Sequence, residues 1–284
     1  MRYDERIVNR VCETLVSSGS TFLPDKIRAY EKAIQSETNE QAKWAMKAIW
    51  ENALVAKKNR SPLCDDTGIP HLILEVGPDR VVTGNMLESI KEGIRQGLRT
   101  LPGRPMAVKG DDSHRIDQSL GLDEDPAALE AAPILIRNIE DNVIKLHILM
   151  FGGGPAIRGK TYRVFHKHNV QTVLDEIISW ATEGTTMLGC TPCTLAVGVG
   201  RSHYEASSMM LQALVDGTYD KQNDMEKEIT ARVNAVGVGP LGLGGNTTVL
   251  ATFMKVGPQR ASGVRVVCMR PCCCVEPRIA MVEL

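Results

Sequence analysis

The chain has 284 residues, of which 43% are hydrophobic, 24% are charged and 4% are aromatic, and its formal net charge is −1. The hydrophobic content excludes a disordered chain, and the near-zero charge with few aromatic residues argues against nucleic acid or an anionic membrane surface as a partner. No run of about 18 apolar residues occurs, so the sequence predicts no membrane-spanning segment.

Residues 1–60 are predicted to be mainly helical. Val11 and Leu15 fall on one face of a first helix, and Pro24 occupies the first turn of a second. A third helix is expected over residues 38–58, where alanine, isoleucine and valine recur at helical spacing.

The rest of the chain alternates short apolar strands with amphipathic helices and contains nearly all of the 25 glycines. The apolar patterns predict strands at 71–77, 132–137, 142–150, 194–200, 249–256 and 263–269, and helices at 86–100, 170–183, 203–216 and 223–235. The predicted fold class is therefore α+β, with a helical amino-terminal segment packed on a glycine-rich mixed α/β body of residues 61–284. No linker or repeat is visible, and we expect a single domain over residues 1–284.

The segment Cys64-Asp65-Asp66-Thr67-Gly68 concentrates reactive groups that a core strand would not contain. Two adjacent carboxylates repel each other and are costly to bury without a cation or hydrogen-bond donors. Neighbouring anions raise the pKa of a thiol, whereas a bound metal ion deprotonates it. The pattern indicates a metal or cluster site with an acid–base carboxylate beside it; the alternative is a surface turn.

The eight cysteines predict metal or redox chemistry more than disulfides, because the amino terminus carries no apolar signal segment. For the same reason we expect a cytoplasmic protein. Cys190 and Cys193 have a C-x-x-C spacing that suits zinc, a cluster or a redox pair, although a strand follows where a redox pair would open a helix. Cys272, Cys273 and Cys274 lie close to the carboxyl terminus.

Two further features are typical of anion binding. Gly152-Gly153-Gly154 follows a predicted strand, where glycines let backbone amides approach an anion, although a plain turn is the alternative. Arg104 lies between turn-forming residues, which would fix its guanidinium, although a solvated loop arginine is the commoner case.

Three cysteine-bearing segments, around residues 64, 190 and 272–274, suit a [4Fe–4S] cluster that leaves one iron open to substrate. Zinc would require a fourth ligand to close a structural site. The sequence therefore favours a cluster, with zinc as the alternative.

Five motifs in order resemble the α subunit of the iron–sulfur hydro-lyases, the class I fumarase and L-tartrate dehydratase family. Residues 64–68 are similar to its Cys-Gln-Asp-Thr-Gly, residues 152–154 to its glycine triplet, and residues 190–192 to its Cys-Pro-Pro. Residues 242–248 are similar to its Gly-Leu-Gly-Gly-Lys-Thr-Thr, and Cys274 with Arg278 matches its Cys-x-x-x-Arg ending. The resemblance spans nearly the whole chain and implies the fold of the class I fumarase α domain.

The resemblance also implies roles for individual residues. A [4Fe–4S] cluster would be held by Cys64, Cys190 and Cys274, with Cys272 and Cys273 as alternatives to the last. Asp66 would assist proton transfer. The substrate would be contacted by Asp65, Arg104, Gly153 and Gly154. Asp65 stands where the family has a neutral glutamine, so it adds a negative charge beside the expected anionic substrate.

The implied function is the addition or removal of water across the double bond of a small dicarboxylate of the fumarate/malate or tartrate type. The resemblance implies a partner β subunit that supplies the base, in an α2β2 assembly. The alternative from another class is a non-catalytic paralogue that binds zinc or another metal through its cysteines. Metal and sulfide content distinguish the two hypotheses.

Overall fold

The computed structural model describes residues 3–284. It contains two compact units: the first comprises the chain up to Phe22, Asn52–Gly152 and Arg278–Leu284, and the second comprises Leu23–Glu51 and Gly153–Pro277. Each unit is built around one mixed four-stranded sheet covered by helices, which confirms the α+β prediction. Within the described residues, no helix is long and apolar enough to cross a membrane. A single folding domain over the whole chain stays a prediction.

The sheet of the first unit has the strand order β2-β1-β3-β8, with β1 parallel to β2 and the other two pairs antiparallel. Its strands are β1 (Ile69–Val76), β2 (Leu135–Asn138), β3 (Ile144–Phe151) and β8 (Arg278–Glu283). Its helices are α1 (Glu5–Ser20), α4 (Gly84–Thr100), the short α5 (Asp112–Asp117) and a 3-10 turn at Pro126–Leu129. The helix α3 (Glu40–Asn59) ends in this unit.

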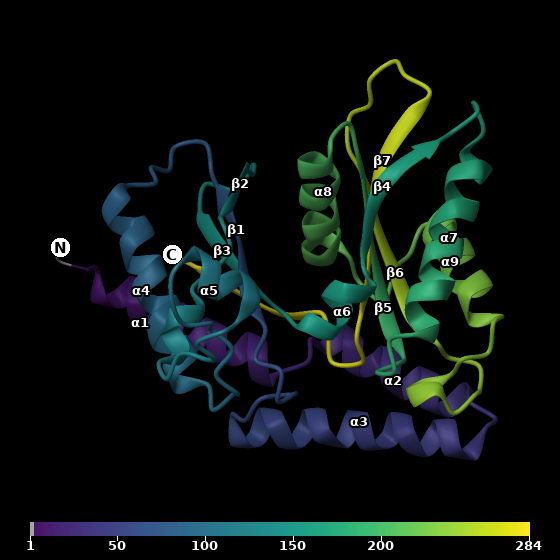
Figure 1. Cartoon of the computed structure of the whole chain (residues 1–284), viewed down its shortest axis with the longest axis horizontal. Helices are drawn as coiled ribbons and strands as arrows, with labels where there is room; N and C mark the ends of the chain where they lie inside the picture. The colour runs from purple at the N-terminus through teal and green to yellow at the C-terminus, as the bar shows by residue number, and fades with distance from the viewer. Residues whose placement is uncertain (1–2) are drawn as a thin grey trace. The chain divides into compact units, whose positions relative to one another are not determined.

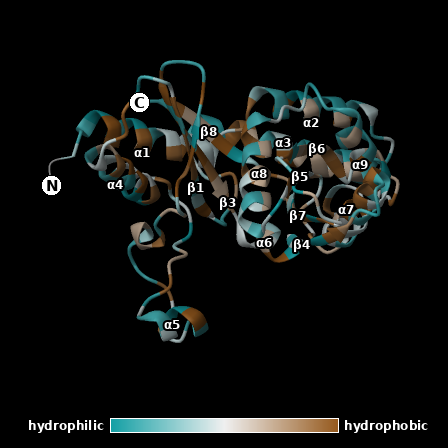
Figure 2. Ribbon diagram, turned by 90° about the horizontal axis from the view of Figure 1, so that it is seen from above, coloured by the Kyte–Doolittle hydropathy of each residue, from teal (hydrophilic) through white to brown (hydrophobic). Residues whose placement is uncertain are grey.

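Helices α1 and α4 pack against each other on one face of the first sheet (Figure 1). The side chains of Asp4 and Thr83 cap the two helices by accepting a backbone hydrogen bond in the first turn. Leu15, Ile94 and Leu98 then bury their side chains against the apolar residues of β1 and β3. Figure 2 shows α5 at the tip of a long excursion that leaves this packed core.

The opposite face of the first sheet carries a largely buried group of ionisable side chains. Arg137 Nε donates to Glu75 Oε1 at 2.9 Å, and His147 Nε2 lies 3.0 Å from Glu75 Oε2. Burial raises the pKa of Glu75, but the hydrogen bonds from His147 and Arg137 outweigh it, so this pKa lies below its ordinary value. The cluster explains why a histidine alternates with apolar residues along β3.

Because the pKa of Glu75 is lower in the folded state, the ionised carboxylate stabilises the fold above the pKa of the unfolded chain. This contribution is lost as the pH falls below about 4. We therefore expect Glu75→Gln to have a lower free energy of unfolding than the wild type at neutral pH. The difference between the two should become smaller below about pH 4. Urea unfolding across this range measures it, and a difference that does not change with pH would contradict the assignment.

The sheet of the second unit has the order β4-β7-β5-β6, with β5 parallel to β6 and the other pairs antiparallel. Its strands are β4 (Lys160–Phe165), β5 (Cys193–Gly200), β6 (Val249–Val256) and β7 (Val264–Cys272). Its helices are α2 (Pro24–Ser36), most of α3, α6 (Gly153–Arg158), α7 (Val170–Thr186), α8 (His203–Asp216) and α9 (Asp224–Asn234), with a 3-10 turn at Pro240–Gly242.

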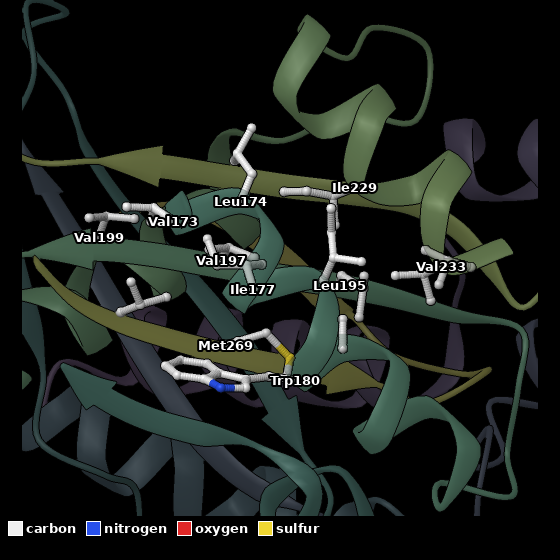
Figure 3. Close-up of a cluster of buried hydrophobic side chains, with 14 of the residues drawn as sticks. Val173, Leu174, Ile177, Trp180, Leu195, Val197, Val199, Ile229, Val233 and Met269 are labelled. Atoms are coloured by element: carbon white, nitrogen blue, oxygen red, sulfur yellow. The ribbon is translucent and has the colours of Figure 1, made fainter. Parts of the chain in front are cut away.

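Helices α7 and α9 cover one face of the second sheet, and α8 packs on β5, β6 and β7 from the other side (Figure 1). The core under α7 and α9 consists of buried apolar side chains (Figure 3). Ile177, Leu195 and Ile229, from α7, β5 and α9, have no exposed surface there. Every residue of β5 is buried, as expected for a central strand covered on both faces.

Every helix and strand that the sequence analysis predicted lies within a few residues of its expected place. The strands β4 and β8 and the short helices α5 and α6 were not predicted. The glycine triplet falls between β3 and α6, so Gly153 and Gly154 begin a helix rather than a plain turn.

Candidate functional site

The bend Cys64–Gly68 connects α3 to β1 and rests on the first residue of β8. Arg278 is 1% exposed, and its Nη1 donates to Asp66 O at 2.7 Å while its Nε donates to Met150 O at 3.2 Å. Gly68 has a φ of +80°, and a Cβ there would lie 2.5 Å from Arg278 Nη2 and 2.8 Å from Phe151 O. The bend thus lies so close to Arg278 and the end of β3 that only glycine fits at this position.

Arg104 lies beside the bend and contacts it through both backbone and side chain. Thr67, which is 3% exposed, donates from its hydroxyl to Arg104 O at 2.7 Å. Arg104 Nη1 lies 3.3 Å from Asp65 Oδ2, and Cys64 Sγ donates to Asp65 Oδ1 at 3.5 Å. The structure therefore brings together four of the predicted site residues in the first unit: Cys64, Asp65, Asp66 and Arg104.

In the second unit, Cys190 and Cys274 lie side by side although they are far apart in the sequence. Cys274 N donates to Cys190 O at 2.8 Å. A hydrogen bond from the Cys274 thiol lowers the pKa of Cys190 to about 6. Cys273 also makes a hydrogen bond with Cys274, so Cys274 contacts two of the predicted cysteines. Cys274 is the preferred third ligand, and Cys273 is one of its alternatives.

Two other cysteines are placed differently. Cys272 ends β7 with no exposed surface, and burial raises the pKa of its thiol well above the ordinary value. Cys193 opens β5, where burial raises its pKa in the same way. Both thiols are built into the second sheet as core residues, whereas Cys190 is exposed. Cys272 is therefore the weaker alternative ligand.

The helix α2 holds the cysteine loop through two residues that the sequence analysis did not single out. Lys26 Nζ donates to Glu276 O at 2.6 Å, and Tyr30 Oη donates to Cys274 O at 2.7 Å. Both side chains are almost fully buried, and burial lowers the pKa of Lys26 to about 8. The sequence signal is a lysine and a tyrosine four residues apart on one helix face.

Replacing Tyr30 with phenylalanine removes only the hydroxyl that donates to Cys274 O. We expect Tyr30→Phe to lower the free energy of unfolding by about 1–3 kcal/mol, because the buried carbonyl loses its donor. Urea denaturation measures the change. Tyr204→Phe is the matched control, since Tyr204 is 76% exposed and its variant should be neutral. Equal effects at the two positions would contradict the anchoring role.

A buried ion pair closes the cysteine loop. Arg270 Nη2 lies 3.0 Å from Glu276 Oε2 and 3.2 Å from Glu276 Oε1. The side chains are 8% and 0% exposed, respectively. The two partners flank residues 272–274, so the pair fixes both ends of the loop.

The thiols of Cys190 and Cys274 suit an iron–sulfur cluster because they lie close enough to share a hydrogen bond, which lowers the pKa of Cys190 and raises that of Cys274. The third predicted ligand, Cys64, belongs to the first unit. Within residues 3–284, no three histidine, cysteine, aspartate or glutamate side chains are grouped so as to hold a metal ion. Gly153 and Gly154 are exposed, and a Cβ at Gly154 would meet only open space.

Comparison with known proteins decides the family. The family model described as fumarate hydratase (fumerase) matches residues 9–282, which is nearly the whole chain. The chain belongs to this family. The predicted resemblance to the hydro-lyase α subunits is confirmed, and so is the prediction that the protein is an enzyme of the hydro-lyase class.

Three relatives of the fumerase family show how far the similarity extends. The protein named "Putative L(+)-tartrate dehydratase subunit alpha" from Methanocaldococcus jannaschii is 27% identical over 260 residues, covering 88% of each chain. The L(+)-tartrate dehydratase subunit alpha of Escherichia coli K12 is 21% identical over 280 residues, covering 94% of this chain and 89% of that one. The "Putative fumarate hydratase class I" of Geobacillus stearothermophilus is 26% identical over 267 residues, but this chain spans only 50% of its length.

Proposed function

We propose that the chain is the α subunit of a [4Fe–4S]-dependent hydro-lyase that adds or removes water across the double bond of a small dicarboxylate. The pairing of Cys190 with Cys274 is the observation that carries the proposal, because it joins two motif cysteines from distant segments. Cys64, Cys190 and Cys274 are the proposed cluster ligands. When bound, the cluster would supply an iron that acts as a Lewis acid on the substrate hydroxyl.

The remaining site residues have roles that follow from their chemistry. The Asp66 carboxylate takes up or returns a proton, and Arg278 positions it by holding its backbone carbonyl. Arg104 and Asp65 contact the substrate together, and the exposed backbone of Gly153 and Gly154 offers amide donors. These assignments follow the order of the family motifs and are consistent with the contacts within each unit.

The proposal includes a β subunit that supplies the base, in an α2β2 assembly. It also includes an α chain with the fold of the class I fumarase α domain. Two relatives that are named as α subunits support the existence of the partner β subunit. All eight cysteines are thiols rather than disulfides in the described residues, which suits the reducing cytoplasm that an iron–sulfur enzyme needs. A zinc-binding, non-catalytic paralogue is the alternative, and membership of an enzyme family does not favour it.

The test is the anaerobic assay of the chain with and without its β subunit, after loading with iron and sulfide. We expect elimination of water from L-tartrate or L-malate only when both subunits are present. Asp66→Asn should reduce kcat by about 100-fold or more, because it removes the proton-transferring carboxylate. The absence of turnover with both acids in the loaded assembly would overturn the proposal.

A further inference from the structure

The guanidinium that is proposed to bind substrate already has an anionic partner within the chain. Arg104 Nη1 lies 3.3 Å from Asp65 Oδ2, and the two side chains are 54% and 79% exposed. Thr67 holds the backbone of Arg104 against the bend by its hydrogen bond to Arg104 O at 2.7 Å. The backbone of Arg104 is therefore held in place, while the charged groups of both side chains remain exposed to solvent.

The Asp65 carboxylate offsets the positive charge that a substrate would otherwise encounter at Arg104. A substrate carboxylate placed at Arg104 would lie beside the Asp65 carboxylate, and the two anions would compete for one guanidinium. A hydroxyl group has no such conflict, because its O–H donates to the Asp65 carboxylate while its oxygen accepts from an Arg104 N–H. An exposed ion pair contributes little to stability, so a hydroxyl can enter between the partners.

We infer that Asp65 and Arg104 together select a substrate hydroxyl rather than a carboxylate at this position. The preferred substrate is then a 2,3-dihydroxy dicarboxylate, in which one hydroxyl leaves and the other is held by this pair. The inference rests on the proposed function and specifies its substrate class. A site built to hydrogen-bond a hydroxyl discriminates strongly against an analogue that lacks it, because its polar groups are then left unpaired.

Asp65→Asn in the loaded αβ assembly tests the inference with two independent readouts. The first is the kcat/KM ratio of L-tartrate to L-malate, which we expect to exceed one in the wild type and to fall about tenfold or more in the variant. The second is the Kd of succinate, which has no hydroxyl, measured by calorimetry. We expect it to fall about fivefold or more, because Arg104 becomes free for a carboxylate.

Asp112→Asn is the matched control, since Asp112 forms an exposed ion pair with Arg115 in α5 of the same unit, at the tip of the excursion in Figure 2. It should change neither readout. An unchanged succinate Kd in Asp65→Asn would overturn the inference, and so would a tartrate-to-malate ratio within twofold of the wild type. Absence of turnover with both acids would instead overturn the proposed function, and the succinate measurement would still decide the role of Asp65.

Discussion

Glu276→Gln is expected to lower the free energy of unfolding by about 3–5 kcal/mol, because it leaves the buried Arg270 guanidinium without its counter-charge. Glu276 has no exposed surface, and both of its carboxylate oxygens accept from Arg270 Nη2. Its backbone carbonyl also accepts from Lys26, so the residue anchors the cysteine loop at two points. The loop carrying Cys274 should loosen together with the loss of stability.

Urea denaturation of the variant measures this effect. The double variant Arg270→Met, Glu276→Leu removes both charges and should recover most of the loss. Glu205→Gln is the surface control: Glu205 pairs with Arg201, which is 48% exposed, so its loss should cost about 1 kcal/mol or less. If Glu276→Gln costs no more than Glu205→Gln, the ion pair does not hold the loop.

Gly68→Ala is expected to destabilise the first unit by about 2–5 kcal/mol. Part of this cost arises because Gly68 has a φ of +80°, a conformation that a Cβ disfavours. The rest arises from crowding, since the added Cβ would lie 2.5 Å from Arg278 Nη2 and 2.8 Å from Phe151 O. Arg278 would have to release Asp66 O, so kcat of the loaded assembly should fall as well.

Gly121→Ala separates the cost of the positive φ from the cost of crowding. Gly121 also has a positive φ, of +72°, but a Cβ there would meet no heavy atom within 4 Å. Its variant should therefore lose only about 1–2 kcal/mol, and kcat should be unchanged. Equal losses in the two variants would show that the contact with Arg278 contributes nothing.

The sequence allowed prediction of the elements whose apolar residues follow a regular period. Helix α7 and strand β5 are examples, because each buries a continuous apolar surface. Strand β4 was missed because it is an edge strand, and Tyr162 and Phe165 are exposed along it, which leaves no clear alternation. Strand β8 was missed because it begins with a buried arginine, a residue that sequence patterns place on the surface.

The motifs led to a proposed set of site residues, but they did not indicate the groups that contact those residues. Asp65 has a cationic neighbour that the sequence did not name: Arg104, which lies in a separate loop. Lys26 and Tyr30 were missed because a helix pattern alone does not reveal that polar side chains on the buried face contact a loop near the other end of the chain. Such contacts depend on tertiary packing, which a single sequence does not specify.

The central claim is that Cys64, Cys190 and Cys274 hold a cluster, and metal analysis tests it most directly. The chain with its β subunit, reconstituted anaerobically with iron and sulfide, should contain about four irons and four sulfides per α chain. Serine replacement of Cys64, Cys190 or Cys274 should each abolish this content. Replacement of the half-buried Cys12, or of Cys273, should preserve it. One zinc without sulfide, or a full iron content in the Cys190→Ser variant, would contradict the account.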